Sequence, residues 1–316
     1  MHKPVIIAGA GPVGLTLALL LHRQGRPVRV FESVDELKPP GVGINLLPHS
    51  VRVLYGPDGI SSTARRSLYP DEGAPIYGGR ILWRGVTEDD TFIDGSTMFM
   101  AGHQDCKFVA YPIAGRKGGR QLINWIAELS VPDFEQNDQD WNREVSIDVF
   151  KDPFQSWTFG WIDIPALIDN CEHVYEFPLS DRDPLPCWAH GNMTVVGDAA
   201  HPMYPIGSNG ASQGILDAEK LAVELSRSTD IPAAFAAYEA ERRPATAAIV
   251  LANRRNGPEQ VMQIVEERAP HGFDDINDVI SREELETIAA QYKQTAGFNV
   301  EAVNGKASDQ RSTLWQ

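Results

Sequence analysis

The sequence is poor in cysteine, and the few cysteines it has are badly placed for a structural role. Cys106, Cys171 and Cys187 are far apart in the chain and odd in number. This spacing suggests neither a disulfide framework nor a cysteine metal cluster. A reducing cytoplasm is therefore the expected location.

Positive charge is also in short supply. The 316 residues contain 28 Lys and Arg against 43 Asp and Glu, which gives a formal net charge of −15. Such an acidic surface does not attract polyanions, so it argues against nucleic acid and against an anionic membrane as partners. The length suggests either two domains or one α/β domain with an inserted layer.

A long uninterrupted apolar segment is missing as well. Residues 4–21 carry no charge and follow Lys3, which superficially resembles a signal peptide with Ala-Gly-Ala as its cleavage site. Cleavage there would remove the first glycine of a phosphate-binding loop, and Gly and Pro interrupt the run before any sustained apolar helix. We therefore expect neither a secretory signal nor a membrane helix.

The first thirty residues carry a dinucleotide-binding pattern. Residues 5–8 read as a buried strand, the turn Gly9-Ala10-Gly11-Pro12-Val13-Gly14 follows at once, and a helical run over 15–24 leads to a strand over 28–31. In this pattern the first glycine allows a tight turn, the second a close pyrophosphate and the third close helix packing. Glu32 then lies where a carboxylate accepts hydrogen bonds from the adenosine ribose. The pattern predicts dinucleotide binding but does not choose between NAD and FAD.

A second glycine-bearing turn lies two-thirds along the chain. Residues 193–196 favour a short buried strand, Gly197-Asp198 ends it, and Pro202 and Pro205 keep the connection extended before a helix from Ala211. An Asp at a strand end that faces a helix amino terminus can hold a hydroxyl-rich chain and a developing anion together. A reduced flavin with its ribityl tail has this profile.

The same stretch resembles a known motif. G-D-A-A-H-P, then P-I-G-S-N-G-A-S-Q and D-A, is similar to the second flavin motif of the FAD-dependent aromatic monooxygenases, in a form like that of the phenazine-carboxylate hydroxylases. The resemblance implies FAD as cofactor and NAD(P)H as electron donor. It also implies transfer of one oxygen from dioxygen, through a flavin hydroperoxide, to an aromatic small molecule, with carboxylated rings among the candidates.

The site residues follow from the two turns and from this resemblance. No catalytic side chain is expected because the flavin carries the chemistry, and the sequence shows neither a nucleophile with a base nor metal-ligand spacing. The cofactor-binding candidates are Gly9, Gly11, Pro12, Gly14, Glu32, Ser33, Gly43, Asp58, Gly197, Asp198, Gly207, Asn209, Gly210 and Ala211.

Compared with the family that it resembles, the sequence lacks a block after Leu54. D-G-I-S-S-T-A-R at 58–65 resembles the family's middle motif, yet only 25 residues, rich in Pro, Gly and turn formers, separate Glu32 from Asp58. A further parallel strand with its crossover needs more chain than this. The sequence therefore predicts a truncated parallel sheet and a poorly anchored Asp58, with an ordinary Asp-Gly turn as the alternative.

Residues 78–130 predict a second layer that resembles the substrate-domain sheet of the same monooxygenases. Strands are expected over 80–86, 97–101, 108–113 and 121–127. Trp83, Tyr111 and Trp125 are candidates for an aromatic pocket, with plain core as the alternative reading.

Four smaller expectations concern the second half of the chain. His201 should make a structural hydrogen bond, and Arg182 and Asp183 should form an ion pair. Pro244 should break or restart a helix. Ile264, Ile276, Val279 and Ile280 are possible docking points of a polar C-terminal segment.

The predicted fold is α/β: a Rossmann-like FAD-binding domain with a truncated parallel sheet, an inserted mixed or antiparallel sheet for substrate, and C-terminal helices. Residues 1–70 with 188–256 would form the FAD-binding domain, 71–187 the substrate sheet and 257–316 a helical tail whose end is expected to be disordered. The rival hypotheses are a flavin-binding remnant without turnover, a flavin oxidoreductase that inserts no oxygen, and an NAD-dependent dehydrogenase, which the Asp198 loop disfavours. The motifs carry no signal for the substrate, for NADH over NADPH or for an oligomeric state.

Overall fold

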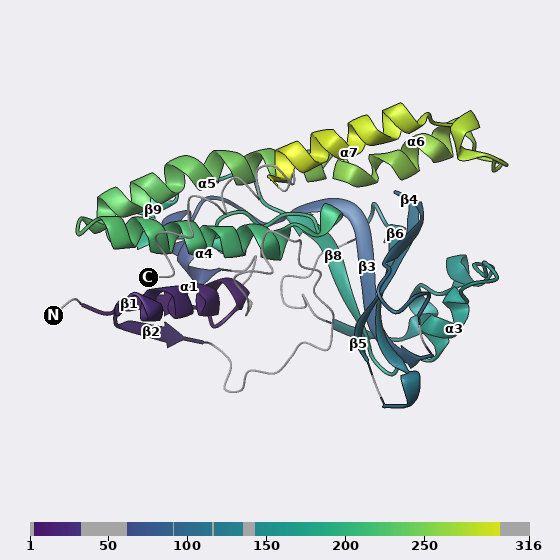
Figure 1. Cartoon of the computed structure of the whole chain (residues 1–316), viewed down its shortest axis with the longest axis horizontal. Helices are drawn as coiled ribbons and strands as arrows, with labels where there is room; N and C mark the ends of the chain where they lie inside the picture. Colours follow the sequence, from purple (N-terminus) through teal and green to yellow (C-terminus); the bar gives the residue numbers. More distant parts are fainter. Residues whose placement is uncertain (1–2, 33–61, 91, 116, 135–142, 298–316) are drawn as a thin grey trace.

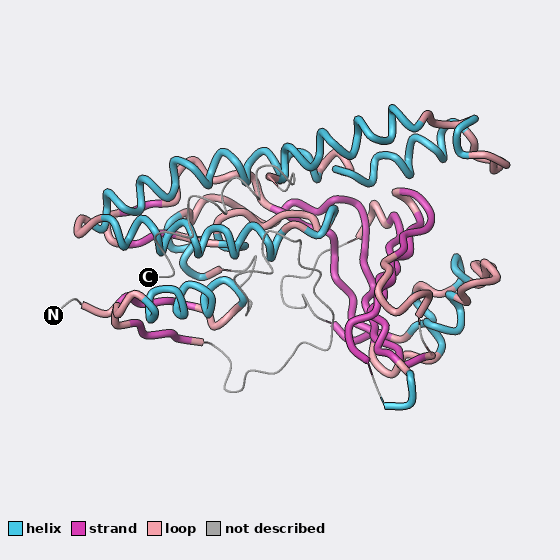
Figure 2. Tube along the Cα trace, in the orientation of Figure 1, coloured by secondary structure: helices cyan, strands magenta, loops and turns pink. Residues whose placement is uncertain are grey.

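The chain forms a helical part and a sheet part that lie side by side, and the C-terminal helices extend over the sheet part (Figures 1 and 2). The computed structural model describes residues 3–32, 62–90, 92–115, 117–134 and 143–297. Both parts contain helices and strands, which confirms the predicted α/β class.

The N-terminal strand, helix and strand form as predicted. β1 (Val5–Ala8) pairs in parallel with β2 (Val28–Phe31), and α1 (Pro12–Arg23) connects them. Pro12 stands at the start of α1, where its missing amide costs no helical hydrogen bond.

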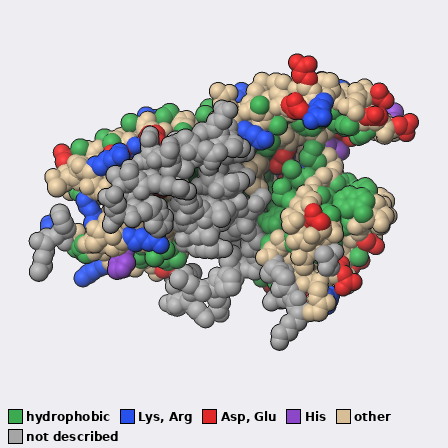
Figure 3. Space-filling view, in the orientation of Figure 1, with side chains coloured by type: hydrophobic (Ala, Val, Ile, Leu, Met, Phe, Trp, Pro, Cys, Tyr) green, Lys and Arg blue, Asp and Glu red, His purple; other side chains and the backbone are tan. Residues whose placement is uncertain are grey.

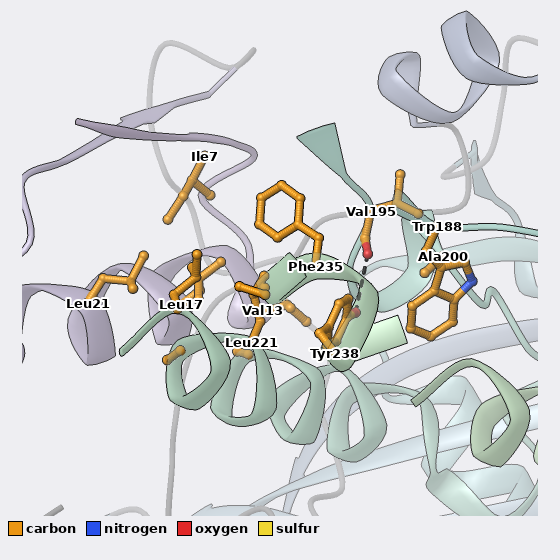
Figure 4. Packing of buried hydrophobic residues seen from close by; sticks show 14 of the residues in the cluster. Ile7, Val13, Leu17, Leu21, Trp188, Val195, Ala200, Leu221, Phe235 and Tyr238 are labelled. Atoms are coloured by element: carbon orange, nitrogen blue, oxygen red, sulfur yellow. Dashed lines mark hydrogen bonds between the residues drawn. The ribbon is translucent and has the colours of Figure 1, made fainter. Parts of the chain in front are cut away.

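One long helix covers α1, and a second long helix packs on the first. α4 (Gly210–Arg227) packs against α1 on one side and against α5 (Ile231–Asn253) on the other. Apolar side chains on α4 recur every three or four residues, so they form one face that is buried in this core. Figure 4 shows part of the core, which is built around Ile7, Val13, Leu17, Leu21, Trp188, Val195, Ala218, Leu221, Leu225, Phe235 and Tyr238.

In the described part of the chain the parallel sheet has two strands, in agreement with the truncated sheet that the spacing predicted. Among the described residues β1 and β2 pair only with each other, and Ile6 and Phe31 are 67% and 56% exposed. The strand predicted over 193–196 is shorter than expected. Within the residues that the structure describes, β10 (Met193–Thr194) pairs only with β9 (Ala189–His190), antiparallel. Val195 is the next residue after β10 and lies outside this strand pair. Its carbonyl accepts a hydrogen bond from the Tyr238 hydroxyl (3.2 Å; Figure 4).

The second layer is a six-stranded antiparallel sheet in the order β4-β5-β6-β3-β8-β7. All four strands predicted between residues 80 and 130 are present, and most are longer than predicted. The bounds are β3 (Ile76–Asp89), β4 (Phe99–His103), β5 (Cys106–Gly115), β6 (Gln121–Ser130), β7 (Arg143–Val145) and β8 (Val174–Asp181).

One face of this sheet forms a core of its own. Side chains alternate between the two faces of a strand, so Ile81 and Trp83 of β3 point the same way. They pack with Trp125 of β6, with Phe150 and with α3 (Ile164–Asp169). The opposite face contacts the helical part through Leu82 and Leu179, which pack with Tyr204 and Ile206.

The C-terminal segment is helical and docked. α6 (Gln260–Arg268) lies near β4, and α7 (Arg282–Ala296) packs against α5. Of the predicted docking points Ile280 is buried, but the main anchors are Ile288, Tyr292 and Ala296 on one face of α7. Several Asp and Glu side chains are visible on the α6 and α7 end in Figure 3.

Pro244 does not break its helix, so that prediction is wrong. α5 runs without interruption from Ile231 to Asn253 with Pro244 inside it. Pro244 and Ala240 both lie on the exposed side, so water can solvate the carbonyl that the proline leaves without a donor. Buried anchors on either side, Arg242 and Thr246 among them, keep the helix in place.

No described helix meets the length and apolarity needed to span a lipid bilayer. The described residues also contain no group of His, Cys, Asp or Glu able to hold a metal ion.

Candidate functional site

The two glycine-bearing turns are in direct contact. A Cβ on Gly197 would lie 2.8 Å from Cγ2 of Val13, and one on Gly214 only 2.4 Å from the same atom. Val13 belongs to the N-terminal turn and points toward α4 (Figure 4), so a larger residue at either glycine would push the two turns apart. Residues about two hundred positions apart therefore build one site.

The N-terminal turn has the geometry of a phosphate-binding loop. Gly9 has φ +103°, which other residues rarely adopt, and a Cβ on Gly14 would lie 2.1 Å from the Gly9 carbonyl oxygen. The Ala10 amide donates a hydrogen bond to Oε2 of Glu32 (2.8 Å). The acid at the end of β2 thus lies beside this loop.

Asp198 and the start of α4 also come together. Oδ1 of Asp198 is 3.8 Å from the position of a Cβ on Gly210, the first residue of α4. Gly207, with φ +70°, and Ser208, with φ +53°, turn the chain into that helix. The first amides of a helix have no carbonyl partner within it, so the turn can present donors to an anion.

Asp217 organises the second turn from beneath, a role that the sequence reasoning missed. It is fully buried and accepts hydrogen bonds from the Gly197 amide (3.0 Å), His201 Nε2 (2.5 Å) and Arg242 Nε (2.7 Å). Burial raises the pKa of Asp217, but the charges and hydrogen bonds of His201 and Arg242 outweigh it and hold this pKa below its usual value. The available signals were the Asp that follows the flavin-like motif and the paired arginines before Pro244.

His201 makes the structural hydrogen bond that was predicted. Its Nδ1 is buried without a hydrogen-bond partner in the described structure. The carboxylate of Asp217 can only accept, so Nε2 carries the proton that it donates to Asp217.

Arg65, from the segment that resembles the middle motif, also supports the second turn. It is buried on α2 (Thr63–Leu68), and its Nη1 donates to the carbonyls of Ala199 (3.2 Å) and Ala200 (3.0 Å). Its other nitrogens bond the Glu72 carboxylate.

Arg182 and Asp183 do not pair with each other, so the predicted ion pair is wrong. Arg182 lies 3.4 Å from Glu72 and donates to the Gly73 carbonyl, whereas Asp183 accepts from Arg254 (2.8 Å). Neighbouring residues on an extended segment point in opposite directions, which separates the two side chains.

The sheet face that meets the helical part carries polar and aromatic groups. The guanidinium of Arg84 lies 5.8 Å from the centre of the Phe177 ring and is hydrogen-bonded to Tyr111. Burial lowers the pKa of Arg84, and Tyr111 partly offsets this. Trp83 and Trp125 lie in the core on the opposite face, so of the three predicted pocket aromatics only Tyr111 is on this side.

Most of the predicted site residues thus lie in two touching turns. Ser33, Gly43 and Asp58 fall outside the described residues. The side chain of Asn209 is fully buried and donates to the Tyr292 hydroxyl (3.0 Å), which brings a C-terminal residue into the second turn.

Two touching glycine turns on an α/β scaffold define a dinucleotide-binding protein. The family described as FAD binding domain matches residues 2–74 and 165–253, so the match covers both turns. The chain belongs to this family.

Similar proteins agree with this assignment. The chain is 44% identical over 223 residues to phenazine 1,6-dicarboxylic acid hydroxylase PhzS of Lysobacter antibioticus, a match that covers 68% of the chain and 54% of that protein. It thus spans about half the length of this curated relative. Among solved structures, 2,6-dihydroxypyridine-3-hydroxylase of Arthrobacter nicotinovorans has a TM-score of 0.68 at 17% identity, covering 87% of this chain and 94% of that one. HpxO of Klebsiella pneumoniae, complexed with FAD and uric acid, has a TM-score of 0.65 at 18% identity, covering 96% and 95%. At these identities the two structures establish the fold.

Proposed function

We propose that this chain is an FAD-dependent monooxygenase that uses NAD(P)H and dioxygen to hydroxylate an aromatic small molecule. The observation that carries the proposal is the contact of Val13 with Gly197 and Gly214, because it joins a dinucleotide turn to an Asp-bearing turn at a helix start. An NAD-dependent dehydrogenase needs only the first of these turns.

The residues present fit FAD. Gly9 and Gly14 keep the turn tight, Gly11 lets a pyrophosphate come close to the backbone, Glu32 can accept from the adenosine ribose, and Asp198 can accept from the ribityl hydroxyls. The described residues proposed to hold the cofactor are Gly9, Gly11, Pro12, Gly14, Glu32, Gly197, Asp198, Gly207, Asn209, Gly210 and Ala211. Ser33, Gly43 and Asp58 complete the proposed set from outside the described residues.

When bound, FAD would supply the electron transfer and the oxygen chemistry. The protein's own part would be binding and electrostatics. The start of α4 would stabilise negative charge with its first amides and its dipole. The sheet face around Leu82 and Phe177 would cover the site and exclude water.

The substrate is proposed to be an aromatic ring that carries a carboxylate. The relative from Lysobacter antibioticus is named for a dicarboxylic acid. Arg84 lies on the sheet face that meets Tyr204 and Ile206, against Phe177 and Tyr111, and this combination suits a flat anionic ring.

A visible spectrum of the purified chain tests flavin binding directly. We expect a yellow protein, and a chain that stays colourless after FAD is added would end the proposal. For a yellow protein, NAD(P)H consumption is compared with and without phenazine 1,6-dicarboxylic acid, while peroxide and hydroxylated product are measured. Product formation supports a monooxygenase, whereas substrate-independent peroxide formation refutes productive hydroxylation.

A flavin-binding remnant without turnover is the second candidate. It is favoured by the two-stranded β1-β2 sheet, which leaves Ile6 and Phe31 largely exposed. A protein that binds FAD but never forms product would establish this alternative.

We propose three parts of the chain: an FAD-binding domain of residues 1–70 with 188–256, a substrate sheet of residues 71–187, and a helical tail of residues 257–316. It is supported by two separate buried clusters, one around Leu17, Leu221 and Tyr238 and one around Trp83 and Trp125. The three free cysteines support a reducing cytoplasm as the location.

A further inference from the structure

The turn that leads into α4 is held by residues from the C-terminal third of the chain. Its carbonyls and amides bond partners on α5, on the segment after α5 and on α7. The Tyr204 carbonyl accepts from Asn253 Nδ2 (3.0 Å), and the Gly207 amide donates to Glu259 Oε1 (3.4 Å). Further on, Gln213 Nε2 donates to the Ala296 carbonyl (3.0 Å).

Tyr292 of α7 lies at the centre of these contacts. Its hydroxyl accepts from Asn209 Nδ2 (3.0 Å) and donates to Asn253 Oδ1 (3.1 Å), with the Ile206 carbonyl at 3.4 Å. Tyr292 is 6% exposed, and Asn209 and Asn253 are fully buried. Burial raises the pKa of Tyr292, so the hydroxyl stays protonated and can donate at neutral pH.

Tyr292 also explains why position 207 is glycine. A Cβ on Gly207 would lie 2.3 Å from the Tyr292 hydroxyl oxygen, and one on Gly257 would lie 3.0 Å from the tyrosine ring. Two turns with positive φ, at Gly207 and Ser208 and at Asn256 and Gly257, therefore meet around this one side chain. Positive φ at Ser208 and Asn256 is unfavourable for residues other than glycine, so the surrounding contacts must hold it.

A buried ion-pair chain connects the same place to the substrate sheet. Glu259 pairs with Lys107 (2.5 Å), Lys107 pairs with Glu128 (3.0 Å), and Glu128 pairs with Arg80 (2.7 Å). Lys107, Glu128 and Arg80 belong to three adjacent strands, so the C-terminal segment contacts both the sheet and the turn before α4.

We propose that Tyr292 is a positioning residue of the flavin site, whose hydroxyl fixes the turn from Ile206 to Gly210 so that the first amides of α4 face the flavin. The inference rests on the proposed function, because it assigns a role toward FAD. It adds the C-terminal helix α7 to a site that sequence motifs place only in the first 253 residues.

The role has a direct physical consequence. Without the hydroxyl, the Asn209 amide and the Asn253 carbonyl oxygen lose their shared partner inside the protein, and each can recover a partner only if the turn moves. Displaced amides stabilise negative charge less well, because such stabilisation depends on preorganised donors. The reduced, anionic flavin would lose more than the oxidised flavin, so the reduction potential should become more negative.

Tyr292→Phe tests this with the ring retained. Hydrogen exchange is measured on the flavin-free chain, where we expect the amides of residues 204–213 to exchange about five- to tenfold faster than in the wild type, as the loss of roughly one hydrogen bond implies. On the FAD-loaded chain we expect weaker FAD retention and a more negative reduction potential. Tyr77→Phe is the matched control, because it also removes a hydroxyl that donates to a carbonyl (Val131, 2.7 Å), but in the sheet.

The outcomes separate the inference from the function on which it rests. Unchanged exchange in 204–213 together with an unchanged potential would overturn the role of Tyr292, as would equal effects of Tyr77→Phe. If the wild type binds no FAD, the proposed function fails, and with it the assignment toward flavin, while the exchange data still decide whether Tyr292 holds the turn. If Tyr292→Phe does not fold, Asn253→Ala, which removes the acceptor of the hydroxyl, must show the same two shifts or the inference is wrong.

Discussion

Replacing Asp217 by Asn should destabilise the protein strongly, although the two side chains have nearly the same size. The carboxylate is fully buried and bonds the Gly197 amide, His201 and Arg242. The substitution leaves Arg242, which is only 8% exposed, without its charged partner. Removing one member of a buried ion pair typically costs about 3–5 kcal/mol. Whole domains are stable by only about 5–15 kcal/mol, so the loss should be large.

Urea unfolding of the flavin-free chain measures this loss. The matched control is Asp183→Asn, because Asp183 also pairs with an arginine, Arg254 at 2.8 Å, but its side chain is 70% exposed. An exposed pair typically contributes about 0–1 kcal/mol, so the control should unfold close to the wild type. If both variants lose the same small amount, the buried network does not stabilise the fold in the way argued above.

The pH dependence of the stability tests the same prediction independently. The pKa of Asp217 is lower in the folded chain than its usual value of about 4. A carboxyl group of this kind stabilises the fold above the unfolded pKa, and the contribution disappears as the pH falls through the lower folded pKa. The wild type should therefore lose stability below about pH 4 more steeply than Asp217→Asn does. Parallel curves would contradict the assigned direction of the pKa.

Three further predictions concern separate parts of the molecule. Gly214→Ala should lower FAD retention and reduce the free energy of unfolding by about 1–3 kcal/mol, because its Cβ would lie 2.4 Å from Val13. The absorbance of bound flavin measures the first effect, and urea unfolding measures the second. Arg65→Met should cost about 2–3 kcal/mol of unfolding free energy by removing buried charged hydrogen bonds, whereas exposed Arg66→Met should change it little. Burial raises the pKa of Tyr77 to about 12, so its contribution to stability should be complete below about pH 10 and be lost as the pH rises through 12. A pH series of urea midpoints should show this loss in the wild type and not in Tyr77→Phe.

The sequence was most informative where function needs special backbone geometry. Gly9, Gly14, Gly197 and Gly207 each occupy positions where a side chain would clash or where φ is positive, and such positions leave a readable glycine pattern. Two groups of elements were predictable from the spacing of apolar residues, because that spacing reflects which side chains are buried. They are the strand, helix and strand near the N-terminus and the four strands between residues 80 and 130.

The supporting contacts were not readable in advance. Asp217 and Arg65 end the two flavin-like motifs, but the motifs do not reveal their buried partners far along the chain, and Tyr292 has no local pattern that distinguishes its role from a surface position. The prediction that Pro244 breaks a helix failed for a related reason. The rule that proline breaks helices takes no account of buried residues such as Arg242 and Thr246, which hold α5 in place. The sequence motifs thus predicted the two turns, whereas the hydrogen bonds that hold these turns in place became visible only in the structure.

The arrangement of the helical core affects the order in which the chain can fold. Among the described residues, residues 5–21 pack mainly against residues 185–238, whereas the six-stranded sheet between them consists mainly of pairings between nearby segments. Closing a loop of more than 150 residues has a larger entropic cost than forming hairpins, so the sheet should form early and the two flanking segments should meet late. During synthesis the first segment must therefore wait, with its apolar helix unpaired, until most of the protein has left the ribosome.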